Sequence, residues 1–395
     1  MTSPTPPVVP TTAYQSEIYL AGLSGTTPAL PTDLTRLEAL AEQKLDSGPF
    51  WYVAGGAGTG ATMRANRAAM DTWRIVPRML REATQRRLAT TVLGTELPAP
   101  VLLAPVGVQS IVHPDGELAV ARAAAELGVP IVLSTASSYT IEEVAEASGT
   151  GPRWYQLYWP TEDEVTISLL KRARAAGFTT LVVTLDTWTL GYRPHDLDQS
   201  YLPFIRGVGT AIPFSDPAFR AKLAAAPEDD LMAAVGRWLP MFTGTALRWD
   251  RLPLLREHWA GPIVLKGVQH PEDARRAIEA GMDGIVVSNH GGRQVDGAVA
   301  ALDTLPGIVA AVDGRAAVLF DSGVRTGADV FKALALGADA VLLARPYVYG
   351  LALAGQDGVR HVLRSLLTEL DVTLGLAGYA DVAELTPDAL VHGRP

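Results

Sequence analysis

From residue 100 onward, short apolar runs alternate with amphipathic stretches. The apolar runs have the length of β-strands and fall at 101–107, 131–135, 153–158, 179–186, 262–267, 284–290, 316–323 and 340–346. The stretches between them, such as GELAVARAAAELG, repeat apolar residues at helical spacing and end in glycine, which favours the left-handed cap of a helix. Near-continuous apolar strands, each followed by a helix, are typical of a parallel sheet that is buried on both faces.

Eight such units predict an α/β fold, a closed (β/α)8 TIM barrel. The alternative is an open, doubly wound sheet. We favour the barrel because the number of units matches. Polar residues also cluster at the carboxyl ends of the strands, where barrels carry their chemistry.

The chain divides into four predicted parts. Residues 1–32 are expected to form an extended arm, 33–99 a helical cap that packs on the barrel, 100–370 the barrel, and 371–395 a tail. About 75 residues separate the fourth strand from the fifth, far more than an ordinary connection needs. Residues 191–259 are therefore predicted to be a long insertion over the barrel mouth, with a helix near its end. A lid that closes over substrate and a merely packed insertion both fit this pattern.

Composition excludes several classes of function. Asp and Glu number 42 against 33 Lys and Arg, and the net charge of −9 argues against a nucleic-acid or anionic-membrane partner. Cysteine is absent, which excludes disulfides, thiolate nucleophiles, thiolate zinc sites and iron–sulfur clusters. No membrane span, secretory signal or metal-ligand motif is recognisable, so we expect a soluble, cytoplasmic protein without a metal site.

His290 is the strongest candidate for a catalytic group. It ends an apolar strand and runs into two glycines, which permit close approach of a ligand. A neutral imidazole there can accept a proton near pH 7. Asp186, at the end of the fourth strand, is a candidate to hold the imidazole in one tautomer and to stabilise its protonated form. The alternatives are a histidine and an aspartate that only cap the segments that follow them.

Three basic residues also fall at the predicted mouth. Arg193 and Arg293 together suit a carboxylate or phosphate, because each guanidinium can bind such a group bidentately. Lys266 ends the fifth strand, and three roles remain open for it: a Schiff-base nucleophile, a positive charge against an electron-rich cofactor atom, or a structural ion pair.

Glycine-rich turns follow the seventh and eighth strands, in DSGVRTGADV (321–330) and ARP (344–346). Barrels commonly bind a phosphate there, through backbone N–H groups and a helix N-terminus, and Arg325 and Arg345 add charge. The glycine cluster near residue 55 follows no predicted strand and is not a dinucleotide fingerprint. The residues alone therefore predict a barrel that binds a phosphorylated ligand, and an anion beside a histidine base.

The segment SNHGGRQVDG (288–297), with LKG before it and DSGVRTGADVFKALALGADAVLLARP after it, resembles the FMN-dependent α-hydroxy acid oxidizing family. The resemblance covers about residues 35–370. It implies FMN as cofactor, a small 2-hydroxy acid and O2 as reactants, and a homo-oligomer, either a tetramer or an octamer.

The same resemblance implies a role for each matching residue. His290 is then the base with Asp186 as its partner, and the other groups that touch substrate are Tyr52, Tyr158, Arg193 and Arg293. Lys266 faces the N1/O2 edge of the flavin. Further FMN contacts are implied for Ala104, Pro105, Val106, Ser134, Gln156, Thr184, Ser288, Asp321, Ser322, Gly323, Val324, Arg325, Ala344 and Arg345.

One departure and one likeness within the family bear on substrate and outcome. Ala136 stands where glycolate oxidases carry tryptophan, as in lactate-using members, and the segment LGYRPHDLDQSYLPF is most similar to lactate 2-monooxygenase. We therefore expect L-lactate to be converted to acetate, CO2 and water; the alternative is an oxidase that releases pyruvate and hydrogen peroxide. A Schiff-base aldolase and a non-catalytic phosphate-ligand-binding barrel are the hypotheses from other classes.

Overall fold

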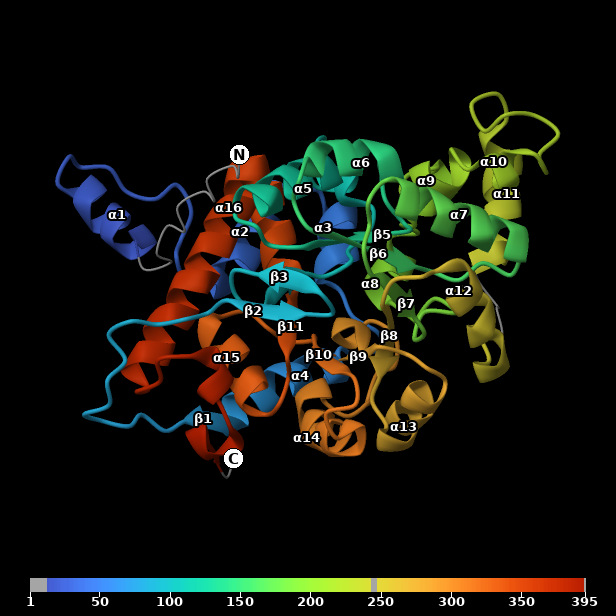
Figure 1. Cartoon of the computed structure of the whole chain (residues 1–395). Helices are drawn as coiled ribbons and strands as arrows, with labels where there is room; N and C mark the ends of the chain where they lie inside the picture. The colour runs from blue at the N-terminus through green and yellow to red at the C-terminus, as the bar shows by residue number, and fades with distance from the viewer. Residues whose placement is uncertain (1–12, 243–246, 394–395) are drawn as a thin grey trace, which may run out of the picture.

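A computed structural model describes residues 13–242 and 247–393. Eight parallel strands close into a barrel in the order β10-β11-β4-β5-β6-β7-β8-β9 (Figure 1). The strands are β4 (Val101–Leu103), β5 (Ile131–Ser134), β6 (Arg153–Leu157), β7 (Leu181–Thr184), β8 (Ile263–Val268), β9 (Gly284–Val287), β10 (Ala317–Phe320) and β11 (Ala340–Leu343). Each falls on one of the eight apolar runs, so the predicted TIM barrel is confirmed and the open sheet is excluded.

The inside of the barrel is layered because side chains alternate along each strand. One layer is apolar and contains Leu102, Val132, Trp154, Val182, Val264, Val286, Leu319 and Leu342. Two residues further along the chain, at or just past the ends of the same strands, lie Ala104, Ser134, Gln156, Thr184, Lys266, Ser288, Asp321 and Ala344. The side-chain period therefore places a mostly polar layer at the carboxyl end, directly above an apolar core.

The opposite end of the barrel is closed by a hairpin of β2 (Thr90–Val92) and β3 (Thr95–Leu97). Val92 and Leu97 join the inner apolar layer, and the Trp154 indole donates a hydrogen bond to Thr95 Oγ1 at 3.0 Å. The barrel is therefore open to ligands at its carboxyl end.

Helices surround the barrel, and several begin at predicted strand-to-helix turns. They are α5 (Gly116–Glu126), α6 (Ile141–Ser148), α7 (Asp163–Ala175), α13 (Pro271–Glu279), α14 (Ala301–Val312), α15 (Gly327–Ala335) and α16 (Arg345–Leu376). Thr326 caps α15 in a reciprocal capping box with Asp329, which fixes the start of the helix that follows the predicted phosphate turn. None of the described helices combines the length and the apolar character needed to traverse a lipid bilayer.

The N-terminal segment differs from the predicted extended arm over 1–32. Residues 1–12 lie outside the described residues, but Ala13–Gly22 form helix α1. Three side-chain contacts hold α1 on α16: Tyr14 Oη lies 2.6 Å from His361 Nδ1, Arg364 pairs with Glu17 at 2.7 Å, and its guanidinium lies 4.1 Å from the centre of the Tyr14 ring. The helix buries no residue, which explains why apolar periodicity did not predict it.

The segment 33–99 begins as the predicted helical cap, with η1 (Leu34–Arg36), α2 (Leu37–Lys44), α3 (Ser47–Ala54) and α4 (Ala61–Thr72). It then turns into β1 (Trp73–Ile75) and the β2–β3 hairpin. β1 pairs with β12 (Leu390–His392), so the predicted tail 371–395 includes a strand that returns to the N-terminal segment. The boundary at residue 370 also cuts α16, which continues to Leu376.

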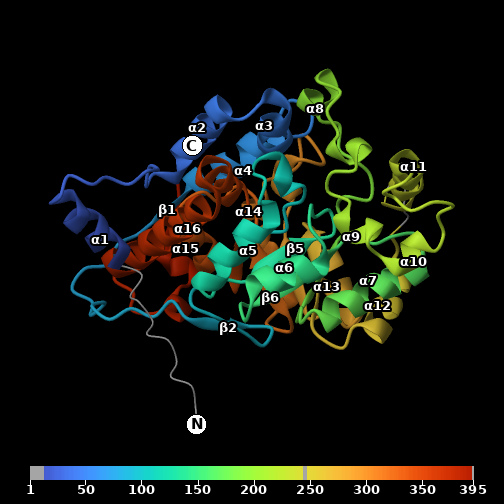
Figure 2. The ribbon, with the colours of Figure 1, turned by 90° about the horizontal axis from the view of Figure 1, so that it is seen from above.

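The insertion 191–259 contains more structure than the single helix predicted near its end. It comprises α8 (Pro194–Asp198), η3 (Pro203–Arg206), α9 (Ala211–Phe214), α10 (Pro217–Arg220), α11 (Leu231–Phe242), η4 (Trp249–Arg251) and α12 (Leu252–His258). Arg172 of α7 anchors it, donating to the Ile212 carbonyl at 3.0 Å and contacting buried Asp216 at 3.3 Å. Figures 1 and 2 place this insertion and α1 at opposite ends of the molecule.

Candidate active site

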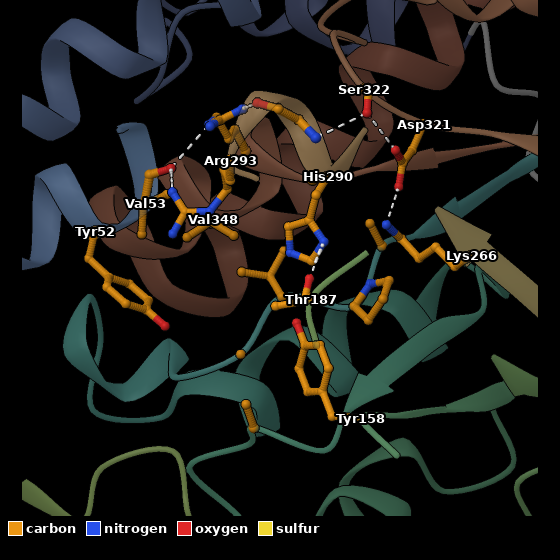
Figure 3. Close-up of a pocket in the computed structure, with 18 of the residues that line it drawn as sticks. Tyr52, Val53, Tyr158, Thr187, Lys266, His290, Arg293, Asp321, Ser322 and Val348 are labelled. Atoms are coloured by element: carbon orange, nitrogen blue, oxygen red, sulfur yellow. Dashed lines mark hydrogen bonds and ion pairs between the residues drawn. The ribbon is translucent and has the colours of Figure 1, made fainter. Parts of the chain in front are cut away.

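A pocket opens at the carboxyl end of the barrel, under the insertion. Figure 3 shows His290 between Arg293 on one side and the Lys266–Asp321 pair on the other, with the rings of Tyr52 and Tyr158 entering the same space. Other predicted residues on its wall are Ala104, Pro105, Val106, Arg193, Ser322, Gly323, Val324, Arg325, Ala344 and Arg345. The structure thus gathers residues from most of the strand ends around one cavity.

His290 is held in one orientation by the end of β7. Its Nδ1 lies 2.9 Å from Asp186 Oδ1 and 3.1 Å from Thr187 Oγ1, which itself donates to the same carboxylate oxygen at 2.8 Å. A proton on Nδ1 satisfies Asp186 and leaves Nε2 as the free, basic nitrogen. His290 sits in η5 (His290–Gly292) with φ +58°, and Asn66 of α4 supports this turn through a 2.8 Å hydrogen bond to Asn289.

The electrostatics of the pair suit a base. Burial lowers the pKa of His290 below its ordinary value, and Asp186 opposes this shift. Burial alone would raise the pKa of Asp186, but the charge of His290 and its hydrogen bond outweigh burial and lower that pKa to about 2. At neutral pH the pair is therefore an ionised carboxylate beside a neutral imidazole.

The shift of His290 predicts the pH dependence of turnover. The base works only when unprotonated, so kcat/KM should be constant at neutral pH and fall as pH drops through a pKa below the usual histidine value. Asp186→Asn removes the interaction that raises this pKa, so the acid limb should move to lower pH while the plateau falls by roughly 100-fold or more. Rates measured from pH 4 to 9 test this; an acid limb that stays in place in the variant would contradict it.

Two arginines face the pocket without strong acidic partners. Arg293 donates to the carbonyl of Gly55 at 2.8 Å, and its guanidinium lies 5.4 Å from the centre of the Tyr52 ring. Burial and neighbouring arginines lower the pKa of Arg293 to about 9. The ion pair of Arg193 with Asp196 is long, 4.0 Å. The two cations therefore leave positive charge available for an anionic ligand.

Gln294 joins this arginine pair to the histidine's partner. Its Nε2 donates to the backbone carbonyl of Asp186 at 2.7 Å, and its Oε1 accepts from Arg193 Nη2 at 2.9 Å. Arg193 Nε also donates to the carbonyl of Arg293 at 3.1 Å. One side chain thus fixes the spacing between Asp186, the partner of His290, and Arg193.

Lys266 is buried and fully engaged. Its Nζ pairs with Asp321 Oδ2 at 3.0 Å and donates to Ser288 Oγ at 2.9 Å. Burial opposes its charge, but Asp321 and Asp186 outweigh burial and raise its pKa. A Schiff-base nucleophile needs a lowered lysine pKa, so this environment disfavours the aldolase hypothesis.

Beneath the pocket floor lies the polar layer of Ser134, Gln156 and Thr184, which are buried and do not form the pocket wall. Gln156 Oε1 accepts from Ser134 Oγ at 3.0 Å, but its Nε2 has no hydrogen-bond partner in the described structure. Leaving a buried amide donor unsatisfied costs about 1–3 kcal/mol. We therefore expect this N–H group to donate to an acceptor atom of a ligand bound in the pocket above it.

The predicted phosphate turns form one corner of the pocket. Ser322 and Gly323 have φ values of +84° and +98°, a conformation that turns the backbone sharply after β10. Arg325 lies here, and its guanidinium donates to the carbonyl of Val324, with burial lowering its pKa to about 10. Arg345 is different: its guanidinium binds the carbonyls of Val53, Gly55 and Gly291, each at 3.0 Å. Arg325 is therefore the cation left for a phosphate, and the side chain of Arg345 braces the loops.

Comparisons with known proteins agree with this geometry. A family model described as FMN-dependent dehydrogenase matches residues 41–392. The chain is 50% identical to the FMN-dependent alpha-hydroxy acid dehydrogenase qulF of Penicillium citrinum, over 96% of this chain and 95% of that protein. It is 42% identical to an L-lactate oxidase of Lysinibacillus sphaericus, over 96% and 98%. A crystal structure of mandelate oxidase superimposes with a TM-score of 0.82 at 40% identity, covering 93% of this chain and all of that one.

These matches and the site define a flavin-dependent oxidoreductase built on a TIM barrel. The chain belongs to the FMN-dependent dehydrogenase family, and FMN is its cofactor. The residues present fit the group: the unpartnered Gln156 amide offers a donor to a flavin ring edge, charged Lys266 lies beside the floor, and Arg325 with the Ser322–Gly323 turn suits the phosphate.

Three contributors to the site were not predicted from the sequence. Thr187 touches both His290 and Asp186, Gln294 links Asp186 to Arg193, and Asn66 supports the turn of His290. Gln294 directly follows Arg293, and Thr187 directly follows Asp186. This adjacency to predicted site residues was the only sequence signal, a weak one, that Gln294 and Thr187 belong to the site. Asn66 belongs to a helix more than 200 residues away, and only the fold brings it here.

Proposed function

We propose that the protein is a 2-hydroxy acid oxidase, which converts an L-2-hydroxy acid and O2 to the 2-oxo acid and hydrogen peroxide. One observation carries the proposal: an oriented, neutral His290 lies in the same pocket as two arginines that lack strong acidic partners. A carboxylate bound to the arginines brings its α-carbon to the base. The oxidase and dehydrogenase names of the relatives support this reaction class.

Each residue then has a defined task. Arg193 and Arg293 bind the carboxylate and orient the substrate, which lowers the entropic barrier. His290 Nε2 takes one proton, and Asp186 stabilises the imidazolium that forms. Bound FMN would supply the acceptor for the two electrons removed from the substrate and the means of reducing O2 with them. Lys266, held by Asp321, balances negative charge at the floor of the pocket.

Tyr52 and Tyr158 complete the substrate site. Burial raises the pKa of both phenols, so they stay protonated and can donate hydrogen bonds to the substrate's oxygens. The Arg293 guanidinium lies 5.4 Å from the centre of the Tyr52 ring, which supports a place for this phenol beside the proposed carboxylate site.

The decisive experiment is anaerobic flavin reduction. Purified protein should be yellow, should lose its flavin absorbance when an L-2-hydroxy acid is added without O2, and should regain it in air. A colourless protein that borohydride traps with a carbonyl substrate would support the aldolase instead. A flavin that no 2-hydroxy acid bleaches would support a barrel that only binds ligands.

The decarboxylating monooxygenase predicted from the sequence is the second candidate. It is favoured by the insertion, because Phe204, Trp238 and Phe242 of this segment line the pocket, and a site enclosed by such a segment slows product release. The names of the relatives favour release of peroxide, so the oxidase is the first choice.

Products formed from L-lactate in air distinguish the two outcomes. We expect pyruvate, with one hydrogen peroxide formed per O2 consumed. The control is excess catalase, because free peroxide decarboxylates pyruvate without the enzyme. Acetate and CO2 that still form stoichiometrically under catalase would show that the 2-oxo acid stays in the site, and would establish the monooxygenase.

A homo-oligomer, tetramer or octamer, remains a prediction for this chain. Exposed apolar side chains support an association, including Leu20 on α1, Leu23 directly after it, and Met79 and Leu80 in the loop after β1. Light scattering on the purified protein tests it.

A further inference from the structure

Beyond the arginines, the pocket continues into an aromatic space under the insertion. We call it the side-chain chamber and define it by Ala136, Phe204, Trp238 and Phe242, all of which line the pocket and are buried. The rings form a continuous series: Tyr52 to Phe204 at 6.4 Å, Phe204 to Trp238 at 5.0 Å, and Trp238 to Phe242 at 5.3 Å. The series begins at Tyr52, which lies beside Arg293, so the chamber extends away from the carboxylate site.

The small side chain of Ala136 keeps this chamber open. The backbone is packed tightly around it: a Cβ at Gly107 would lie 2.8 Å from Ala136 Cβ, and one at Gly209 would lie 3.1 Å from the Ala136 carbonyl and 3.0 Å from Phe204. Gly209 has φ +81°, which lets the insertion approach so closely. Because Ala136 lines the pocket, a larger side chain at this position would extend into the chamber.

Trp238, in the wall of the chamber, carries a polar group that is not satisfied. Trp238 is 6% exposed, and its indole Nε1 is buried without a hydrogen-bond partner in the structure as described. Buried indole N–H groups usually find an acceptor. The two rings packed against the indole, those of Phe204 and Phe242, are apolar and offer none.

We propose that the chamber receives the substrate's side chain and that Trp238 determines specificity. The preferred substrates are 2-hydroxy acids with a bulky, flat apolar side chain that carries a hydrogen-bond acceptor at its far end. The aromatic walls contact the body of the side chain, and the Trp238 N–H binds the acceptor. A methyl group, as in lactate, leaves the walls without contacts and the indole without a partner. This inference rests on the proposed function and deepens it.

Three substrates separate the two parts of the proposal: lactate, mandelate and 4-hydroxymandelate, each as the reactive enantiomer. We expect kcat/KM to rise by at least about 10-fold from lactate to mandelate, because the ring fills the chamber. It should rise further, by about 3–10-fold, when the 4-hydroxyl is added, because that oxygen accepts from the indole.

Substitutions then assign the effects to residues. Trp238→Phe keeps an aromatic wall and removes the donor, so the ratio of kcat/KM for 4-hydroxymandelate to that for mandelate should fall to about 1. Trp249→Phe is the matched control, a tryptophan of the same insertion that lines a different cavity, and should leave this ratio unchanged. Ala136→Trp should fill the chamber and reduce kcat/KM for both aromatic acids by roughly 100-fold relative to lactate.

Equilibrium binding gives a readout that does not depend on turnover. The matching 2-oxo acids, pyruvate, phenylglyoxylate and 4-hydroxyphenylglyoxylate, should perturb the spectrum of the bound flavin with Kd values that follow the same order. In Trp238→Phe, the Kd values for phenylglyoxylate and 4-hydroxyphenylglyoxylate should become equal.

The outcomes separate this inference from the proposed function. If lactate bleaches the flavin best, or if the 4-hydroxyl ratio survives in Trp238→Phe, the specificity proposal is overturned and the oxidase stands. If none of the three acids bleaches the flavin, the proposed function itself has failed.

Discussion

Replacing His290 with glutamine should leave FMN bound and reduce the rate of flavin reduction by 2-hydroxy acids by roughly 100- to 10,000-fold. Nε2 of His290 is the basic atom left free once Nδ1 has donated to Asp186 at 2.9 Å. A glutamine amide can still donate to Asp186, but it cannot accept a proton from the substrate. Stopped-flow mixing without O2 measures this step directly, because it isolates flavin reduction from reoxidation.

The matched control is His392→Gln, which changes an exposed histidine on β12 at the C-terminus. It should reduce its flavin at the rate of the unaltered protein. Near-normal reduction in His290→Gln would show that another group is the base. Loss of the flavin from that variant would show instead that His290 is needed to build the FMN site.

Replacing Arg293 with lysine should weaken both substrate binding and flavin reduction, with kcat/KM falling about 10- to 100-fold. The charge is retained, so a simple electrostatic attraction would survive. Lysine lacks the planar, forked guanidinium. In the unaltered protein this group donates to the Gly55 carbonyl at 2.8 Å and has further N–H groups available for the substrate. Steady-state rates and the Kd of a 2-oxo acid should change together.

A surface arginine provides the control for this change. Arg364→Lys alters the ion pair between α16 and α1, away from the pocket, and should leave kcat/KM unaltered. Unchanged kinetics in Arg293→Lys would assign the carboxylate to Arg193 alone. A fall in kcat without any change in the affinity for the 2-oxo acid would show that Arg293 stabilises only the transition state.

Much of the barrel and its chemistry was predictable because strand periodicity is a local property. Each apolar run both marks a strand and sets its inward-facing positions, so Gln156, Lys266 and Asp321 follow from alternation. The terminal helix α1 was missed because it buries no apolar face and is held by polar contacts to α16.

The different roles of the two arginines in the phosphate turns could not be predicted from local sequence. Arg325 and Arg345 occupy equivalent places after the seventh and eighth strands, and sequence assigns both to an anion. In the fold, Arg345 meets three carbonyls from the N-terminal cap and the η5 turn, while Arg325 meets the carbonyl of its neighbour. Which of the two guanidiniums is available to bind a phosphate therefore depends on segments far away in the chain.

The sequence by itself determined the barrel, the family and the cofactor, and it predicted which residues act as the base and bind the anion, because these depend on strand order and on motifs within single turns. Only the tertiary structure decided the tautomer of His290, the link through Gln294, and the aromatic chamber closed by Trp238. Those features join side chains from the insertion, the cap and the strand ends. Contacts between such distant segments leave no periodic pattern of apolar and polar residues along the chain, so the sequence alone could not predict them.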